Sequence, residues 1–410
     1  MTKLSQEKLI EKESEFCAQN YKPLPVVLSK GKGVWLWDTD RNKYLDMMSA
    51  YSAVSHGHTH PELLKVLHQQ SEILGITSRA FYTNTLGPFL EKLINISGLE
   101  VALPMNTGAE AVETSIKAAR RWAYKTKKVE TNKAEIIVVE GNFHGRTTTV
   151  ISFSTDNESK EDFGPYTPGF VTIKYDDINS LKEAITKNTA AVLIEPIQGE
   201  AGIIIPDSKW LPEVRKICTD NNVLLILDEI QSGLGRTGKM FAYEHSSIKP
   251  DGLILGKALG GGLLPISCFL STSEVMQWFV PGSHGSTFGG YPLAAAIGKR
   301  SLEIIEEDKL VENSKQQGSY FLKELKKIES PILKQIRGKG LWIGVEIDTK
   351  IINGRNMCKH LLKKGILAKE THASIIRFAP PLIIKRKEIE WAVRIIKETL
   401  KEIEGDHIHQ

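Results

Sequence analysis

The sequence has few cysteines, little excess of charge and no long apolar run. Its four cysteines lie far apart and form no CxxC pair, so the sequence indicates neither a disulfide framework nor a zinc site. The formal net charge is only +4, from 53 Lys and Arg against 49 Asp and Glu, and no basic stripe is interleaved with aromatic residues. This pattern argues against a nucleic-acid partner.

No stretch approaches the roughly 18 consecutive apolar residues that cross a bilayer, so we expect no membrane partner. The first residues, MTKLSQEKLIEKESEF, are charged, rich in Glu and without an apolar core, unlike a secretory signal or a transit peptide. Together with the cysteine pattern, these features predict a cytoplasmic protein whose thiols stay reduced.

The length and the apolar pattern predict two domains, because 410 residues exceed what one hydrophobic core usually supports. Residues 33–47 alternate apolar and polar around a DTDRN turn, which is typical of a β-hairpin. Further along, short runs that are apolar on both faces alternate with helical segments such as Glu110–Trp122 and Trp210–Asn221. Such runs are typical of central parallel strands covered by helices, and they lie at 101–105, 135–140, 190–196, 222–229 and 251–257. The sequence therefore predicts a doubly wound α/β domain.

After about residue 290 the pattern indicates a smaller α/β domain. It comprises a long helical stretch, a Gly-rich strand, a short helix, the segment IIRFAPPLII and a last amphipathic helix, at roughly 290–327, 337–347, 354–364, 375–384 and 387–403. We expect the N-terminal hairpin to pack with this part. The predicted organisation is an N-terminal segment at 1–50, a large domain at 51–285 and a small domain at 286–410.

Polar side chains follow three of the buried runs, with Glu195 after AVLI, Asp228 after VLLIL and Lys257 after GLILG. In a doubly wound sheet, ligands bind beyond the carboxyl ends of the strands. A lysine and a carboxylate there suit pyridoxal 5'-phosphate (PLP), because the amine forms a Schiff base and the carboxylate pairs with the protonated pyridine nitrogen. The structural alternative is a buried ion pair or a set of strand-end caps.

Two segments are candidates for binding the cofactor phosphate. In NTGAEA at 106–111, Gly108 lets the backbone approach an anion where a helix begins near Ala109, although a plain N-cap is the alternative. In HGSTFGG at 284–290, Thr287 can donate its hydroxyl. By contrast, GLILGKA lacks the Walker A spacing, and HGHTHP at 56–61 lacks a nearby carboxylate or fourth ligand, so we expect no metal site.

Several motifs occur together in one order: NTGAEA, GNFHGRT (141–147), EPIQGEAG (195–202), LDEIQSGLGRTG (227–238), GKALGGG (256–262) and HGSTFGGYPLA (284–294). As a set they resemble the class III aminotransferases, and within them the ornithine aminotransferases, over nearly the whole chain. The resemblance implies the type I fold of PLP-dependent transferases, an α/β architecture with a large doubly wound, mainly parallel sheet domain plus a smaller α/β domain.

The resemblance also implies the residues that hold the cofactor ring. Lys257 would carry PLP, Asp228 would meet the pyridine nitrogen, and Gln231 would meet the ring hydroxyl. Phe143 would stack on one face of the ring and Ile230 would cover the other.

For the phosphate, the resemblance implies backbone N–H groups of Gly108 and Ala109, joined by Thr287 from the other subunit. The enzyme would then be a homodimer with shared active sites.

Five other residues would bind the substrates. In ornithine aminotransferases the positions matching Tyr21 and Arg146 meet the α-amino and α-carboxylate groups of ornithine, and the position matching Tyr51 lines the same pocket. A planar guanidinium suits a carboxylate, whereas core packing is the alternative for the two tyrosines. Glu200 would neutralise Arg377 while ornithine binds and release it for 2-oxoglutarate, unless the two form a permanent salt bridge.

The implied reaction moves the δ-amino group of L-ornithine to a 2-oxo acid, 2-oxoglutarate, giving glutamate-5-semialdehyde, which cyclises, and glutamate. Lys257 would be the general base. His144 stands where ornithine enzymes carry Trp and acetylornithine enzymes often carry His, while GEAG favours ornithine. The alternatives are acetylornithine or 4-aminobutyrate aminotransferases, an aminomutase of the same fold, and a non-enzymatic α/β binding protein.

Overall fold

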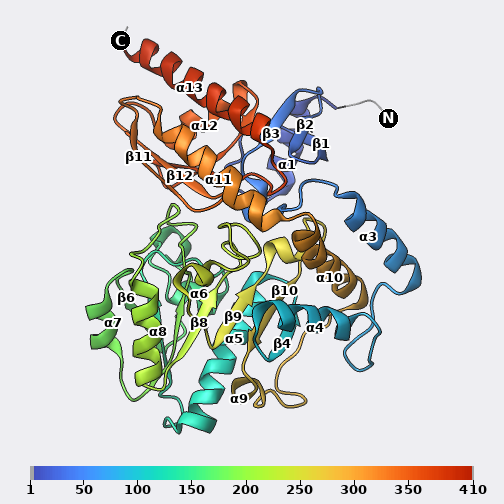
Figure 1. The fold of residues 1–410 in the computed structure, drawn as a ribbon, viewed down its shortest axis with the longest axis vertical. Coiled ribbons are helices and arrows are strands. Elements are labelled where there is room, and N and C mark those ends of the chain that lie inside the picture. Colours follow the sequence, from blue (N-terminus) through green and yellow to red (C-terminus); the bar gives the residue numbers. More distant parts are fainter. Residues whose placement is uncertain (1–3, 409–410) are drawn as a thin grey trace.

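The computed structural model describes residues 4–408, and its largest element is a seven-stranded sheet (Figure 1). The strands follow the order β4-β10-β9-β8-β7-β5-β6. Their bounds are β4 Val101–Met105, β5 Glu135–Val139, β6 Phe170–Ile173, β7 Thr189–Ile194, β8 Leu224–Asp228, β9 Gly252–Leu255 and β10 Ser267–Ser271. From β9 to β6 all neighbours are parallel, so the prediction of a mainly parallel sheet is confirmed.

One strand prediction is wrong in its placement. The run 101–105 does form β4, but it lies at the edge of the sheet and pairs antiparallel with β10, which is itself antiparallel to β9. Helices α4 (Leu86–Ser97) and α5 (Gly108–Trp122) both contact β4. A strand that is packed on by helices carries apolar residues on both faces whatever its direction, which is why the apolar run alone predicted a central parallel strand.

Helices cover both faces of the large sheet, as a doubly wound fold requires. Along β5, Ile137 and Val139 join one hydrophobic cluster, and the alternate residues Ile136 and Val138 join another. Helix α8 (Trp210–Asp220) contributes to the first cluster and α5 to the second. Shorter helical segments complete this part: α6 Thr148–Ser152, α7 Ile178–Ala184, α9 Ser273–Met276, η1 Ala123–Lys127, η2 Asn157–Ser159, η3 Ala242–Ser246 and η4 Lys257–Gly260.

Two four-stranded sheets lie above the large sheet in Figure 1, next to α11–α13. One contains β1 (Leu28–Lys32), β2 (Trp35–Asp38), β3 (Lys43–Asp46) and β13 (Ile366–Leu367). The predicted hairpin is confirmed as β2 and β3, and β3 pairs in parallel with β13. The other sheet has the order β11-β12-β15-β14, with bounds Leu333–Gly338, Ile343–Ile347, Ile375–Phe378 and Lys369–Thr371.

Two predictions in the C-terminal third need correction. The stretch 290–327 forms two helices, α10 (Pro292–Glu307) and α11 (Leu310–Lys326), because Lys309 between them is left-handed with φ +53°. The predicted Gly-rich strand is two antiparallel strands, β11 and β12, with Gly340 in a left-handed turn between them. The remaining helices are α12 (Gly354–Lys363) and α13 (Arg386–Ile408), close to their predicted positions.

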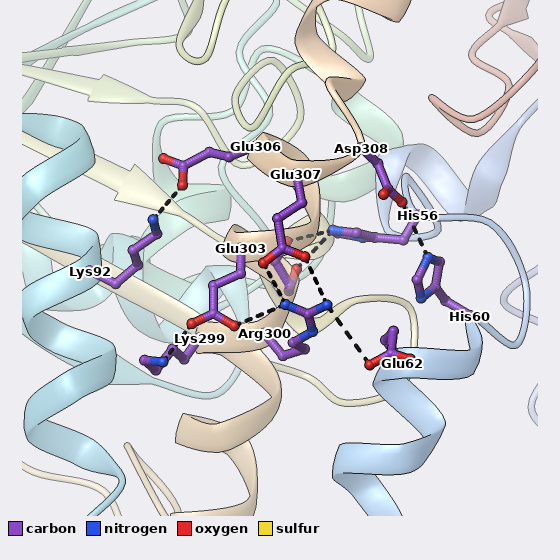
Figure 2. Close-up of polar contacts among 11 residues, drawn as sticks. His56, His60, Glu62, Lys92, Lys299, Arg300, Glu303, Glu306, Glu307 and Asp308 are labelled. Carbon is purple, nitrogen blue, oxygen red and sulfur yellow. Dashed lines mark hydrogen bonds and ion pairs between the residues drawn. The ribbon is translucent and has the colours of Figure 1, made fainter.

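Charged side chains join α10 to the N-terminal helices (Figure 2). Arg300 of α10 pairs with Glu307 at 2.8 Å and lies 3.9 Å from Glu62 of α3 (Pro61–Ile73), while His60 lies 3.6 Å from Asp308. Helix α3 begins at Pro61, a favoured first position of a helix. The contact of His60 with Asp308 ties the HGHTHP segment to the end of α10. Two short N-terminal elements remain, α1 (Gln6–Phe16) and the turn α2 (Ser49–Ser52). No helix in the part of the chain that the structure describes is long and apolar enough to cross a membrane.

Candidate active site

The predicted strand-end residues meet at one pocket. Lys257 follows β9 and Asp228 ends β8, and since these strands are parallel neighbours their carboxyl ends lie together. The pocket is lined by Gly108, Ala109, Phe143, His144, Gly145, Glu195, Asp228, Ile230, Gln231 and Lys257. All the residues predicted to hold a cofactor are among them except Thr287. Two larger hollows beside α12 contain no predicted site residue.

Lys257 has an amine suited to nucleophilic chemistry. Its backbone is left-handed, with φ +44° at the start of η4. Its side chain stays partly exposed because it borders the pocket, yet burial lowers its pKa to about 8, against the opposing charges of Glu200 and Asp228. A lysine with this pKa is partly neutral at neutral pH, which a nucleophile or a general base requires.

Asp228 is held in a fixed orientation by two hydrogen bonds. The N–H of Ile230 donates to Oδ1 at 3.0 Å, and Nδ1 of His144 lies 2.7 Å from Oδ2. Burial opposes the charged imidazole, but the hydrogen bond and charge of Asp228 outweigh it and raise the pKa of His144. Both side chains are almost fully buried. The carboxylate therefore faces the pocket in a defined geometry.

The N-terminus of α5 offers backbone donors at the same pocket. Thr107 is its N-cap and forms a capping box with Glu110, which leaves the N–H groups of Gly108 and Ala109 without acceptors inside the helix. A side chain at Gly108 would not fit, since an added Cβ would lie 2.8 Å from Cδ1 of Ile230. Thr287, in contrast, is exposed and does not line this pocket.

Glu200 and Arg377 form an ion pair beside the pocket. Nη1 of Arg377 donates to Oε1 of Glu200 at 2.7 Å, and Nε2 of Gln231 donates to the same oxygen at 3.0 Å. Burial would raise the pKa of Glu200, but the Arg377 guanidinium outweighs it and holds the pKa below its usual range. The ring centroid of Tyr51 lies 5.0 Å from the Arg377 guanidinium carbon. The structure thus brings together three of the five predicted substrate residues.

The other two predicted substrate residues are exposed. Tyr21 is 77% exposed on the N-terminal segment, near enough to Tyr51 to influence its electrostatics. The guanidinium carbon of Arg146 lies 5.6 Å from the centroid of the Phe143 ring. Neither residue lines the pocket.

A family model for class-III aminotransferases matches residues 16–400. The chain belongs to the class III aminotransferases. This membership confirms the resemblance found in the sequence motifs.

Similar proteins of this family are known from bacteria and from parasites. The chain is 54% identical to the ornithine aminotransferase of Brevibacillus brevis over 96% of this chain and 98% of that one. It is 53% identical to the ornithine aminotransferase of Bacillus subtilis, over 98% and 100%. The crystal structure of the Toxoplasma gondii ornithine aminotransferase matches with a TM-score of 0.97, 40% identity, and coverage of 98% and 96%. The crystal structure of an acetylornithine aminotransferase from Elizabethkingia anophelis matches with a TM-score of 0.89 and 42% identity, over 98% of this chain and 100% of that one. These likenesses confirm the predicted type I fold.

Three residues that line the pocket of this class III aminotransferase, His144, Gly145 and Glu195, were not among those predicted to hold the cofactor. Glu195 accepts from the N–H groups of Phe143 at 3.0 Å and Gly199 at 3.1 Å, so it joins two loops of the site. Burial raises its pKa to about 7, with His144 and the two N–H donors opposing the rise. The signals were present in the sequence: Glu195 ends a buried strand, and His144 follows Phe143.

Proposed function

We propose that this class III aminotransferase uses PLP to move the δ-amino group of L-ornithine to 2-oxoglutarate. The products are glutamate-5-semialdehyde, which cyclises to pyrroline-5-carboxylate, and glutamate. The observation that carries the proposal is the Glu200–Arg377 pair beside the Lys257 pocket, with Tyr51 against it. The ornithine aminotransferases at over 50% identity support it.

The residues of the pocket fit PLP. When bound, the cofactor supplies an electron sink and carries the amino group between substrates. Lys257 would hold it covalently, Asp228 would meet its pyridine nitrogen, and Gln231 would meet its ring hydroxyl. Phe143 and Ile230 would cover the two faces of the ring. A similar Toxoplasma gondii structure is described as having partial occupancy of PLP at its active site.

The phosphate end of the cofactor has a matching anion site. The N–H groups of Gly108 and Ala109 point from a helix N-terminus, where backbone dipoles favour negative charge.

The Glu200–Arg377 pair explains how one pocket takes two unlike substrates. Arg377 would bind the α-carboxylate of 2-oxoglutarate, but ornithine brings an amine to the same place and would leave the guanidinium buried and unpaired. An unpaired buried charge is costly, so Glu200 neutralises Arg377 in that half-reaction. The side chain of Arg377 is only 5% exposed, whereas that of Glu200 is 28% exposed and so is the partner nearer to solvent. We therefore infer that Glu200, and not Arg377, is the side chain that moves when the pair opens.

The far end of ornithine would contact Tyr21, Tyr51 and Arg146. Arg146 provides a planar guanidinium for the carboxylate, and the two tyrosines can accept from the α-amino group. Lys257, freed from the cofactor, would move the proton from Cδ.

A second copy of this chain would cover an apolar surface next to the site. The large apolar residues at 73–82 are strongly exposed, including Ile73 at 75% and Tyr82 at 106%, and Phe288 is 49% exposed. The N–H of Leu293 donates to the oxygen of Gly75, so the 73–82 segment lies beside the first turn of α10, which follows Phe288 in the chain. Exposed contiguous apolar surface is typical of interfaces. In such a homodimer Thr287 would reach the phosphate of the other subunit.

The three-part division of the chain at 1–50, 51–285 and 286–410 is also proposed. The pairing of β3 with β13 supports placing the N-terminal segment with the small domain. The outermost positions of that division, 1–3 and 409–410, lie outside the described residues.

An amine-donor panel tests the function. The PLP-loaded enzyme is assayed with 2-oxoglutarate and ornithine, acetylornithine or 4-aminobutyrate, and pyrroline formation is detected. We expect ornithine to have the highest kcat/KM. His144 makes acetylornithine the competing donor, and a preference for it would refute the proposal. Turnover without any oxo acid would indicate an aminomutase instead.

A further inference from the structure

Arg236 is a fully buried arginine without a charged hydrogen-bond partner. It lies in the segment after β8, and its Nη1 donates to the backbone oxygens of Leu341 at 2.9 Å and Pro380 at 2.6 Å. Its Nη2 donates to the Oγ atoms of Ser49 at 3.1 Å and Ser55 at 3.2 Å. All four acceptors are neutral, and burial lowers the pKa of Arg236 to about 9. The charge of Asp46 opposes this lowering of the pKa, but a buried guanidinium whose hydrogen bonds all go to neutral groups is unusual.

The acceptors of Arg236 come from three separate segments of the chain. Pro380 follows β15, the strand that carries Arg377, and Leu341 precedes β12, which pairs with β15. Ser49 lies in the α2 turn, where its Oγ also donates to the oxygen of Ala379 at 2.6 Å. One side chain therefore ties the α2 turn to the strand that bears Arg377.

The α2 turn has a backbone conformation that needs such support. Ser49, Ala50, Tyr51 and Ser52 are all left-handed, with φ of +44°, +47°, +58° and +77°. None is a glycine, and consecutive left-handed residues with side chains are unfavourable. Strained segments of this kind persist only where the surrounding structure fixes them. Tyr51, at the centre of the turn, packs against Arg377.

We propose that Arg236 is a positioning residue that sets the preference among amine donors, because it holds the turn carrying Tyr51 in place beside Arg377. The inference rests on the proposed function, in which Tyr51 contacts the amino-acid end of ornithine. Arg236 is fully buried and does not line the pocket, so it would act through the turn and not on the substrate itself. Its role differs from that of Arg377, which meets the oxo acid directly.

Donor preference separates this role from a purely structural one. Ornithine has an α-amino group for Tyr51 to orient, whereas 4-aminobutyrate has none. A displaced turn therefore lowers kcat/KM for ornithine and leaves 4-aminobutyrate almost unaffected. General loss of stability would lower both values together, since it removes active enzyme without regard to the donor.

The test uses the PLP-loaded enzyme and two ways of releasing the turn. Arg236→Lys keeps the charge but loses the planar fork, and the double variant Ser49→Ala/Ser55→Ala removes the acceptors on the turn side. Each is made in the wild type and in a Tyr51→Phe background. We expect the ornithine to 4-aminobutyrate ratio of kcat/KM to fall roughly tenfold in the wild-type background. In the Tyr51→Phe background the ratio should stay within about twofold.

Arg215→Lys is the matched control, because Arg215 donates to Asp251 and to the oxygen of Lys249, away from the turn. Its ratio should equal that of the wild type. An unchanged ratio in either test variant, or an equal fall in the Tyr51→Phe background, would overturn the proposal. If Arg236→Lys does not fold, the serine variant decides alone. The wild-type ratio tests the proposed function separately, so the two ideas can fail independently.

Discussion

Replacing Glu200 with Ala tests whether the ion pair to Arg377 opens during the reaction. The variant leaves Arg377 permanently unpaired, with its side chain only 5% exposed. Breaking a buried pair costs about 3–5 kcal/mol and breaking an exposed one about 0–1 kcal/mol. Because Glu200 is 28% exposed, we expect an intermediate cost of about 2 kcal/mol in the complex with ornithine. That cost corresponds to a roughly 30-fold slower ornithine half-reaction.

The half-reaction with 2-oxoglutarate should behave in the opposite way, since its α-carboxylate no longer has to displace Glu200. Its rate should be unchanged or higher. Stopped-flow spectroscopy of each half-reaction measures the two rates separately. The control is Glu346→Ala, because Glu346 pairs with Arg337 at 2.9 Å with similar exposure, whereas Glu200 also accepts from Gln231, which lines the pocket. Equal slowing of both half-reactions by Glu200→Ala, together with a lower Tm, would show a permanent structural bridge and refute the reasoning.

Three further predictions concern single residues. Lys257→Ala should abolish nearly all turnover. Peptide mapping of the wild type after borohydride reduction should find the cofactor on Lys257, and a label on a different lysine would contradict the assignment. Tyr51→Ile should shift preference from ornithine toward 4-aminobutyrate by roughly 10- to 100-fold, and an unchanged ratio of kcat/KM would leave the residue a packing role only. Burial lowers the pKa of His56 (Figure 2) to about 4 from an ordinary 6.5, and its hydrogen bond with the oxygen of Ser301 opposes this lowering. Below pH 6.5 the unfolded chain therefore binds more protons than the folded one, and the free energy of unfolding should fall by up to about 3 kcal/mol between pH 6.5 and 4. In urea titrations at several pH values, His56→Gln should reduce this dependence on pH. An equal dependence in the variant and the wild type would argue against the prediction.

The centre of the fold could be predicted from sequence because its signal is local. The runs that became β5, β7, β8 and β9 are apolar on both faces, and each ends beside a turn or a polar residue. The errors arose where a local pattern has two structural meanings. Strand β10, with the sequence SCFLS, was not predicted. Because β4 is an edge strand that pairs with β10, the antiparallel direction of β4 could not be predicted either. The break between α10 and α11 occurs at Lys309, and neither Gly nor Pro marks it in the sequence.

The site shows the same division between local and distant information. Lys257 and Asp228 follow consecutive parallel strands, so sheet geometry alone brings them together. Glu200 and Arg377 are far apart in the chain, and only the family resemblance linked them before their 2.7 Å contact was seen. No pattern marked Arg236, because its four acceptors come from three distant segments.

The placement of these residues explains how one fold can serve several amine donors. The residues proposed to hold the cofactor lie at strand ends of the large sheet and at the start of α5. Arg377 lies on β15 of a small sheet, and Tyr51 lies on a strained turn held by hydrogen bonds rather than by a regular helix. We expect changes in the second group to alter the far end of the proposed substrate site without moving Lys257. A backbone this similar to both ornithine and acetylornithine aminotransferases therefore cannot by itself identify the donor. We expect donor choice to depend on side chains such as Tyr51 and on the contacts that hold them.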